Sequence, residues 1–171
     1  VCLGSGINSR SSHSAYTTIN QAHLRGDVRV SRGGRAEVLP QGNRDLDNVK
    51  WVHHDRVGYV FPEPASVHLS NRAQQGKWSD ISAAKSASDE PVTHDVFLLG
   101  VDHGDRSASA SYQYIVVPGV APEEVARTSG NNRAIEILSN TPDLQGVFHH
   151  GLGLCQLAFY KAGEVNLPNG C

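Results

Sequence analysis

The sequence predicts an all-β protein, a large antiparallel two-sheet β-sandwich with one short helix near residues 122–128. Short β-branched and aromatic segments recur about every 8 to 15 residues, with turn residues between them. Apolar residues at helical spacing never extend beyond about two turns. Regularly spaced strands without intervening helices favour a sandwich over alternating βαβ units. We therefore expect residues 1–171 to form a single β-sandwich domain.

The composition excludes several functional classes. The 171 residues include 15 Lys and Arg and 17 Asp and Glu, giving a formal net charge of −2. This balance gives no electrostatic reason to expect nucleic acid or an anionic membrane as a partner. No apolar stretch approaches the roughly 20 residues of a transmembrane helix, and no signal-peptide pattern opens the chain. Because Val1-Cys2-Leu3 resembles a strand interior, we expect an excised or processed piece of a larger protein.

The first 50 residues alternate short strands with polar turns. A β-branched segment covers residues 16–20, and Val28 and Val30 lie on one face of the next strand. Gly33-Gly34 is a hairpin signal before a strand at residues 36–39. Residues 43–48 are predicted to be a polar loop.

The middle of the chain begins with a strand at Trp51-Val52. Strands at residues 57–61 and 65–69 follow, and Pro62-Glu63-Pro64 separates them because proline cannot donate to a sheet ladder. Residues 71–95 are the least apolar part of the chain.

Two apolar segments at residues 96–101 and 110–117 flank a polar turn that contains Gly104. Large side chains on both faces indicate strands that are covered on both sides. We interpret this pair as a central hairpin of the sandwich.

The single predicted helix begins at Pro122, has acids in its first turn and closes at Gly130. Strands at residues 134–138, 145–149 and 154–160 complete the chain. The predicted core consists of Phe97, Leu99, Val101, Tyr114, Val116, Ile137, Phe148, Leu157 and Phe159.

Five segments, in order, resemble polysaccharide lyase family 8, which holds the hyaluronate, chondroitin and xanthan lyases. The central one is Val101-Asp102-His103-Gly104 followed by Ser111-Tyr112-Gln113-Tyr114-Ile115-Val116-Val117-Pro118-Gly119. The others are Val1-Cys2-Leu3-Gly4-Ser5-Gly6-Ile7, Thr17-Thr18-Ile19-Asn20-Gln21, Trp51-Val52-His53-His54-Asp55 with Gly58-Tyr59-Val60-Phe61-Pro62, and Ile137-Leu138-Ser139-Asn140-Thr141.

The resemblance implies the central supersandwich domain, of galactose-mutarotase-like fold, in a secreted or periplasmic lyase. For residues 71–95 it implies a long edge strand followed by a loop. Such enzymes cleave uronic-acid polysaccharides by β-elimination. They use Asn, His, Tyr and Arg residues from an N-terminal helical toroid and a Glu from the first part of the β region. No segment here matches those motifs. The implied role is therefore a scaffold and one wall of the substrate cleft, with the toroid and a C-terminal β domain as partners.

Reasoning from the side chains also places no catalytic residue here. The adjacent pairs His53-His54 and His149-His150 would face opposite sides of a strand, so neither pair chelates one ion. Asp102 and His103 are adjacent in the same way and precede a turn. We assign no catalytic residue, no metal ligand and no cofactor, and any substrate-binding residues stay open.

Other polar and aromatic features are interpreted as structural. Gly4-Ser5-Gly6 is too short for a phosphate loop and is read as an ordinary loop, and Gly-x-Ser-x-Gly is absent. Cys2 and Cys155 are read as small core residues, whereas the state of Cys171 is open. Tyr112 and Tyr114 share a strand face, which is more typical of a core than of a sugar-stacking platform.

Two alternative functions remain open at this stage. A non-catalytic carbohydrate-binding or adhesion sandwich would expose coplanar aromatic rings and bind sugar without turnover. A jelly-roll metal enzyme would bring histidines from separate strands around one ion, and elemental analysis would detect it.

Overall fold

The computed structural model describes residues 1–130 and 134–168. Within these ranges the chain forms two antiparallel sheets of eight and three strands, in agreement with the predicted fold class. The strands are β1 (Cys2–Ile7), β2 (Tyr16–His23), β3 (Arg29–Arg32), β4 (Arg35–Val38), β5 (Gly42–His54), β6 (Val57–Gly76), β7 (Val92–Asp102), β8 (Ala110–Pro118), β9 (Ile135–Asn140), β10 (Leu144–His149) and β11 (Leu154–Phe159). None of the helices in these ranges is long and apolar enough to span a membrane.

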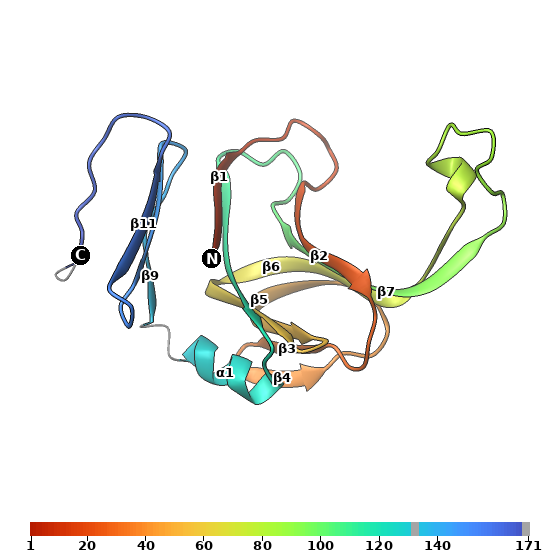
Figure 1. Ribbon diagram of the computed structural model, residues 1–171, viewed down its shortest axis with the longest axis horizontal. Helices are drawn as coiled ribbons and strands as arrows, with labels where there is room; N and C mark the ends of the chain where they lie inside the picture. Colours follow the sequence, from red (N-terminus) through yellow and green to blue (C-terminus); the bar gives the residue numbers. More distant parts are fainter. Residues whose placement is uncertain (131–133, 169–171) are drawn as a thin grey trace.

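Strand β6 organises the larger sheet, whose order is β1-β8-β6-β5-β3-β4 with β2 and β7 branching from β6 (Figure 1). Its first residues, from Val57 to Val60, pair with both β5 and β8, and residues 67–71 pair with β5 and β7. Between these two parts lie Pro62 and Pro64, which lack the N–H that a ladder requires. The sequence prediction of two separate strands is therefore wrong. One continuous strand exchanges β8 for β7 at the prolines.

The predicted central hairpin is also wrong. Strand β7 pairs with β2 and β6, whereas β8 pairs with β1 and β6, so β6 lies between the two supposed partners. An apolar run, a polar turn and a second apolar run indicate two strands, but these features do not specify which strands exchange hydrogen bonds.

Two predicted loops belong to strands. Residues 43–48 lie within β5, where Leu46 is buried and pairs with Val67 of β6. The polar residues on either side of Leu46 face the opposite side of the sheet, as strand alternation requires. Gly4-Ser5-Gly6 likewise lies within β1, where Gly4 packs directly against the ring of Tyr112.

Local signals elsewhere are confirmed. Gly33 and Gly34 form the two-residue β3–β4 turn with positive φ angles of 55° and 81°. The predicted helix is α1 (Pro122–Gly130), and Glu124 Oε2 accepts the N–H of Ala121 at 2.8 Å, as in a capping box. Beyond β6, the expected loop contains a short 3₁₀ helix, η1 (Trp78–Asp80).

The main core fills one face of the eight-stranded sheet, and α1 covers part of the other through buried Val125, which packs with Trp51, Val60 and Ile115. Of the predicted core, Ile137 is half-buried, and the assignment is wrong for Val116, Leu157 and Phe159, which are exposed. The residues buried as predicted are Phe97, Leu99, Val101, Tyr114 and Phe148. Val116 shares the face of Tyr114, yet it is 41% exposed whereas Tyr114 is 9% exposed.

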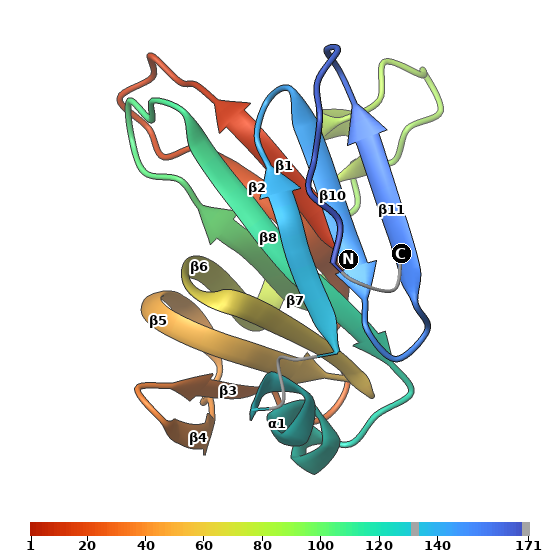
Figure 2. The same cartoon turned by 90° about the vertical axis from the view of Figure 1, so that its left-hand side faces the viewer.

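The three-stranded sheet lies beside β1 and β8 (Figure 2). Asn140 at the end of β9 links the sheets, because its Nδ2 donates to the carbonyl oxygen of Tyr112 at 3.0 Å. Large apolar side chains of β11, among them Leu157 and Phe159, remain uncovered.

Candidate functional site

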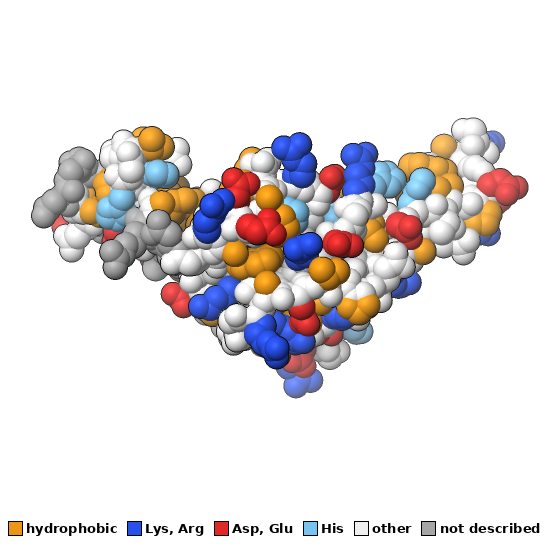
Figure 3. All heavy atoms as spheres, turned by 90° about the horizontal axis from the view of Figure 1, so that it is seen from below, with side chains coloured by type: hydrophobic (Ala, Val, Ile, Leu, Met, Phe, Trp, Pro, Cys, Tyr) orange, Lys and Arg blue, Asp and Glu red, His pale blue; other side chains and the backbone are white. Residues whose placement is uncertain are grey.

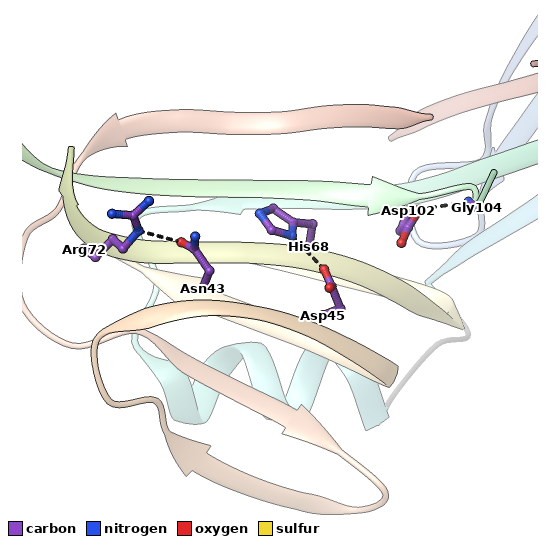
Figure 4. A network of polar contacts seen from close by, with 6 residues as sticks. All are labelled: Asn43, Asp45, His68, Arg72, Asp102 and Gly104. Carbon is purple, nitrogen blue, oxygen red and sulfur yellow. Dashed lines mark hydrogen bonds and ion pairs between the residues drawn. The ribbon is translucent and has the colours of Figure 1, made fainter. Parts of the chain in front are cut away.

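A polar surface on strands β2, β5, β6 and β7 is the most organised cluster of functional side chains. We call the surface formed by Tyr16, Asn43, Asp45, His68, Ser70 and Arg72 the polar face. Strand alternation creates it: Val67 and Leu69 of β6 enter the core, whereas His68, Ser70 and Arg72 point to the opposite side. The register places Asn43 opposite Ser70 and Asp45 opposite His68. Side chains distant in sequence thus meet on one surface (Figure 4).

Hydrogen bonds between β5 and β6 order this surface. Arg72 Nε donates to Asn43 Oδ1 at 2.9 Å, and His68 Nδ1 lies 2.7 Å from Asp45 Oδ1 (Figure 4). The ring of Tyr16 on β2 approaches the His68 ring, with 5.5 Å between centroids. Gly100 of β7, opposite His68, contributes no side chain between them.

A cavity of about 380 Å³ lies at the Arg72 end of the polar face. It is lined by Asn43, His68, Ser70, Arg72, Gln74, Gln75 and Leu98. Ser70 is only 4% exposed, and within residues 1–130 and 134–168 its hydroxyl has no hydrogen-bond partner. A buried hydroxyl without a partner is uncommon in folded proteins and calls for an explanation.

A larger groove lies where the two sheets meet. Cavities of about 950 and 480 Å³ adjoin there and share Glu63, Gln113 and Asn140. His150 lines the larger one and pairs with Glu136 at 2.8 Å. The lining mixes carboxylates with apolar residues, and none of the described residues that line it is an arginine or a lysine.

The surface charge is mixed. Lys and Arg side chains alternate with Asp and Glu over the face seen in Figure 3, with no extended area of one sign. This pattern agrees with the small net charge of −2.

The histidines considered as metal ligands have separate structural partners. His53 Nε2 lies 3.0 Å from the carbonyl oxygen of Val120, and His54 Nε2 accepts the backbone N–H of Arg25 at 3.0 Å. His54 also stacks on Phe97, with ring centroids 4.2 Å apart. Burial lowers the pKa of His54, although the nearby Asp55 carboxylate acts in the opposite direction.

The other candidates are similarly dispersed. Asp102 Oδ1 accepts the N–H of Gly104 at 2.8 Å, and His103 Nε2 lies 2.8 Å from Thr17 Oγ1. Burial lowers the pKa of His103 as well. His149 Nδ1 accepts the N–H of Leu152 at 3.2 Å. In the part of the chain that the structure describes, no three His, Cys, Asp or Glu side chains converge to hold a metal ion.

Tyr112 and Tyr114 pack against the main core with centroids 5.9 Å apart, so they do not form an exposed stacking platform. Burial raises the pKa of Tyr114. Cys2 packs on the same core, and Cys155 is also partly buried. Cys171 lies outside the described residues.

Sequence reasoning missed the polar face because it treated residues 43–48 as a loop. One signal was present: Asn43, Asp45 and Asp47 alternate with other residues around Leu46, which is the pattern of a half-buried strand. The pairing of this strand with His68 and Arg72 could not be read from the sequence, because it depends on register.

Two parts of the chain match domains of one enzyme family. Residues 1–129 match the polysaccharide lyase family 8 super-sandwich domain, and residues 136–170 match the C-terminal β-sandwich domain of the same family.

Individual relatives agree with this assignment. Chondroitinase-AC of Pedobacter heparinus is 40% identical over 170 residues, covering 98% of this chain and 23% of that protein. Xanthan lyase of a Bacillus species is 30% identical over 170 residues, covering 94% of this chain and 18% of that protein. A chondroitinase AC lyase structure, from a study of enzyme–oligosaccharide complexes, superimposes with a TM-score of 0.86 at 38% identity over 98% of this chain and 24% of that one.

A Paenibacillus xanthan lyase structure gives a TM-score of 0.83 at 26% identity, over 96% of this chain and 17% of that one. The chain thus spans less than a quarter of the length of these relatives. Since the super-sandwich match alone covers most of the sequence, the chain belongs to polysaccharide lyase family 8.

Proposed function

We propose that this chain is the central β region of a lyase that cleaves a uronic-acid polysaccharide, of the glycosaminoglycan or xanthan type, by β-elimination. The observation that carries the proposal is the 40% identity to chondroitinase-AC along 98% of the chain. The matched region is only 23% of that enzyme, so most of its length lies outside this chain. In this proposal the chain is a scaffold and one wall of the substrate cleft.

The chemistry of β-elimination supports placing the catalytic residues outside this chain. Removing a proton from a sugar ring requires a base, an acid and groups that neutralise the uronate, all within one cleft. Here His53, His54 and His103 are each engaged by structural partners on different parts of the sheet. The inter-sheet groove has carboxylates where a uronate would require cations.

We further propose that the parent protein is exported and that its own domains cover the surfaces left open here. The exposed apolar side chains of the three-stranded sheet, including Leu157 and Phe159, support a covering partner there. Because residues 136–170 match the C-terminal β-sandwich domain, the proposed partner at this sheet is the rest of that domain in the parent protein. An N-terminal helical toroid is the proposed opposite wall of the cleft.

The test compares the 171-residue chain with the full-length parent enzyme on hyaluronan, chondroitin and xanthan. Elimination forms a C4–C5 double bond conjugated with the carboxylate, so ultraviolet absorbance rises with each cut. We expect turnover by the parent on at least one polymer and none by the chain alone. Turnover by the chain that disappears on replacing His103 or His149 would contradict the proposal, as would an inactive but folded parent.

A further inference from the structure

We propose that the cavity at the Arg72 end of the polar face binds a sugar unit that carries an anionic group, a carboxylate or a sulfate ester. This site would hold polysaccharide without cleaving it. The class of polymer is taken from the proposed function, but binding at this cavity does not require that the chain take part in catalysis.

Arg72 supplies the anion-binding group. Its Nε donates to Asn43 Oδ1 at 2.9 Å and its Nη1 donates to the carbonyl oxygen of Ala73 at 3.2 Å. These two bonds fix the plane of the guanidinium, and within the described residues Nη2 has no partner. A held guanidinium with free N–H groups matches the paired oxygens of a carboxylate or sulfate.

Ser70 supplies a group that lacks a partner in the free protein. Its hydroxyl is buried in the floor of the cavity and, among the described residues, makes no hydrogen bond. The register places Ser70 between Asn43 and Leu98, two residues before Arg72 on the same face. A ligand hydroxyl or oxyanion reaching this floor would recover the hydrogen bond that burial has removed.

His68 and Tyr16 supply the surface for the sugar ring. A carboxylate oxygen only accepts, so the short contact with Asp45 assigns the proton to His68 Nδ1 and leaves Nε2 to bind a ligand. The exposed Tyr16 ring lies beside His68 and offers an apolar face to the C–H groups of a pyranose.

The charged side chains at the two ends of the polar face define the orientation of the bound sugar. Asp45 lies opposite His68 in the register and is held by it, with its carboxylate on the side away from Arg72 (Figure 4). Asp47 is held by Ser66, two residues before His68 on β6 and so farther from Arg72. Carboxylates repel an anion but accept sugar hydroxyls, so the anionic group belongs at Arg72 and the hydroxyls near Asp45. His68 and Arg72 are four positions apart on β6, which is about 13 Å along the strand. This length is about that of two linked sugar rings.

The experiment titrates the 171-residue chain with three probes of equal ring number and follows binding by calorimetry and amide chemical shifts. A hyaluronan tetrasaccharide carries carboxylates alone, a chondroitin 4-sulfate tetrasaccharide adds sulfate, and cellotetraose is neutral. We expect both acidic probes to bind about tenfold more tightly than cellotetraose. Binding of the sulfated probe alone would also support the proposal and would identify sulfate as the recognised group.

The variant Arg72→Gln should weaken binding of the acidic probes about tenfold and abolish their advantage over cellotetraose. Arg35→Gln is the matched control, because Arg35 is an exposed arginine on β4, outside the polar face; it should change affinity less than about twofold. Ser70→Ala should weaken binding about threefold or more. Its unfolding midpoint should not fall, since the lost hydroxyl had no partner.

Binding of the acidic probes that is equal in Arg72→Gln and the unchanged chain would overturn the proposal. So would the absence of shift changes at residues 68–74 up to about 10 mM probe. Ultraviolet turnover by the parent enzyme is measured separately, so failure of this binding site and failure of the proposed lyase function are distinguished.

Discussion

The two sheets use similar strands yet bury their aromatic residues very differently. Phe97, on β7 of the eight-stranded sheet, is fully buried, whereas Phe159, on β11 of the three-stranded sheet, is 46% exposed. His54 and Tyr59 pack on the Phe97 ring from β5 and β6. No second layer covers Phe159 among the described residues. The same residue type in the same kind of strand is therefore core in one region and surface in the other.

This difference shows that a sheet is stabilised by what packs on its faces as much as by its own ladder. The eight-stranded sheet packs a large apolar core on one face, and α1 covers part of the other face. The three-stranded sheet carries exposed apolar residues, and no described segment of the chain packs over them. Four predictions, in decreasing order of expected effect, test the contrast.

The largest effect is expected for Phe97→Ala. This change removes a fully buried ring from the centre of the main core and should lower the free energy of unfolding by about 3 to 5 kcal/mol. Urea unfolding followed by circular dichroism gives the value. A loss below about 1 kcal/mol would show that the main core does not hold the sheet together.

The next effect concerns two glycines that each face a side chain. A methyl group at Gly58 would lie 2.5 Å from Val125 Cγ2, and one at Gly146 would lie 2.6 Å from Leu157 Cδ2. Val125 is fully buried, whereas Leu157 is 37% exposed and can turn aside. Gly58→Ala should therefore cost about 1 to 3 kcal/mol, and Gly146→Ala distinctly less.

Gly76→Ala is the control for the glycine pair, because a methyl group there meets nothing within 4 Å. The double variant Gly58→Ala with Val125→Ala should show a favourable coupling, since the clash partner is removed. Equal losses for Gly58→Ala and Gly146→Ala would contradict the contrast between the two regions.

A smaller effect concerns pH. Burial lowers the pKa of His54 below its ordinary 6.5, so the unfolded chain binds the proton more tightly than the folded chain. The stability from neutral His54 is present above pH 6.5 and decreases as pH falls from there toward the folded-state pKa. The unfolding midpoint at pH 5.5 should therefore be lower than at pH 7.5, and His54→Phe should reduce the difference. His13→Gln, in an exposed loop, controls for loss of an imidazole.

The smallest effect is expected for Phe159→Ala in this chain. A side chain that is 46% exposed should contribute about 1 kcal/mol or less. Hydrogen exchange of β11 amides should also be faster than that of β7 amides. If Phe159→Ala instead destabilises this chain as much as Phe97→Ala, then the three-stranded sheet has a packed core of its own. In the parent enzyme the cost should rise if the rest of the C-terminal β-sandwich domain covers the ring, as proposed.

The sequence alone determined the features that depend on near neighbours. Helix α1 follows from Pro122, the acids of its first turn and the Glu124 contact with Ala121. The β3–β4 turn follows from Gly33-Gly34, because glycine adopts two successive positive φ angles at the least steric cost. The all-β class and the family resemblance also required only patterns along the chain.

Tertiary structure alone decided strand partners, burial and the candidate site. The apolar pattern of β7 and β8 fits pairing with each other as well as it fits pairing with β6. In the structure both strands form ladder hydrogen bonds with β6 and none with each other among the pairs described. Phe159 is as apolar as Phe97, but it is 46% exposed because none of the described segments packs over its side of the sheet. The cavity joins Asn43 to Arg72 only because the β5–β6 register aligns one face of each strand. Such register is set by packing across the whole sheet, which local sequence does not encode.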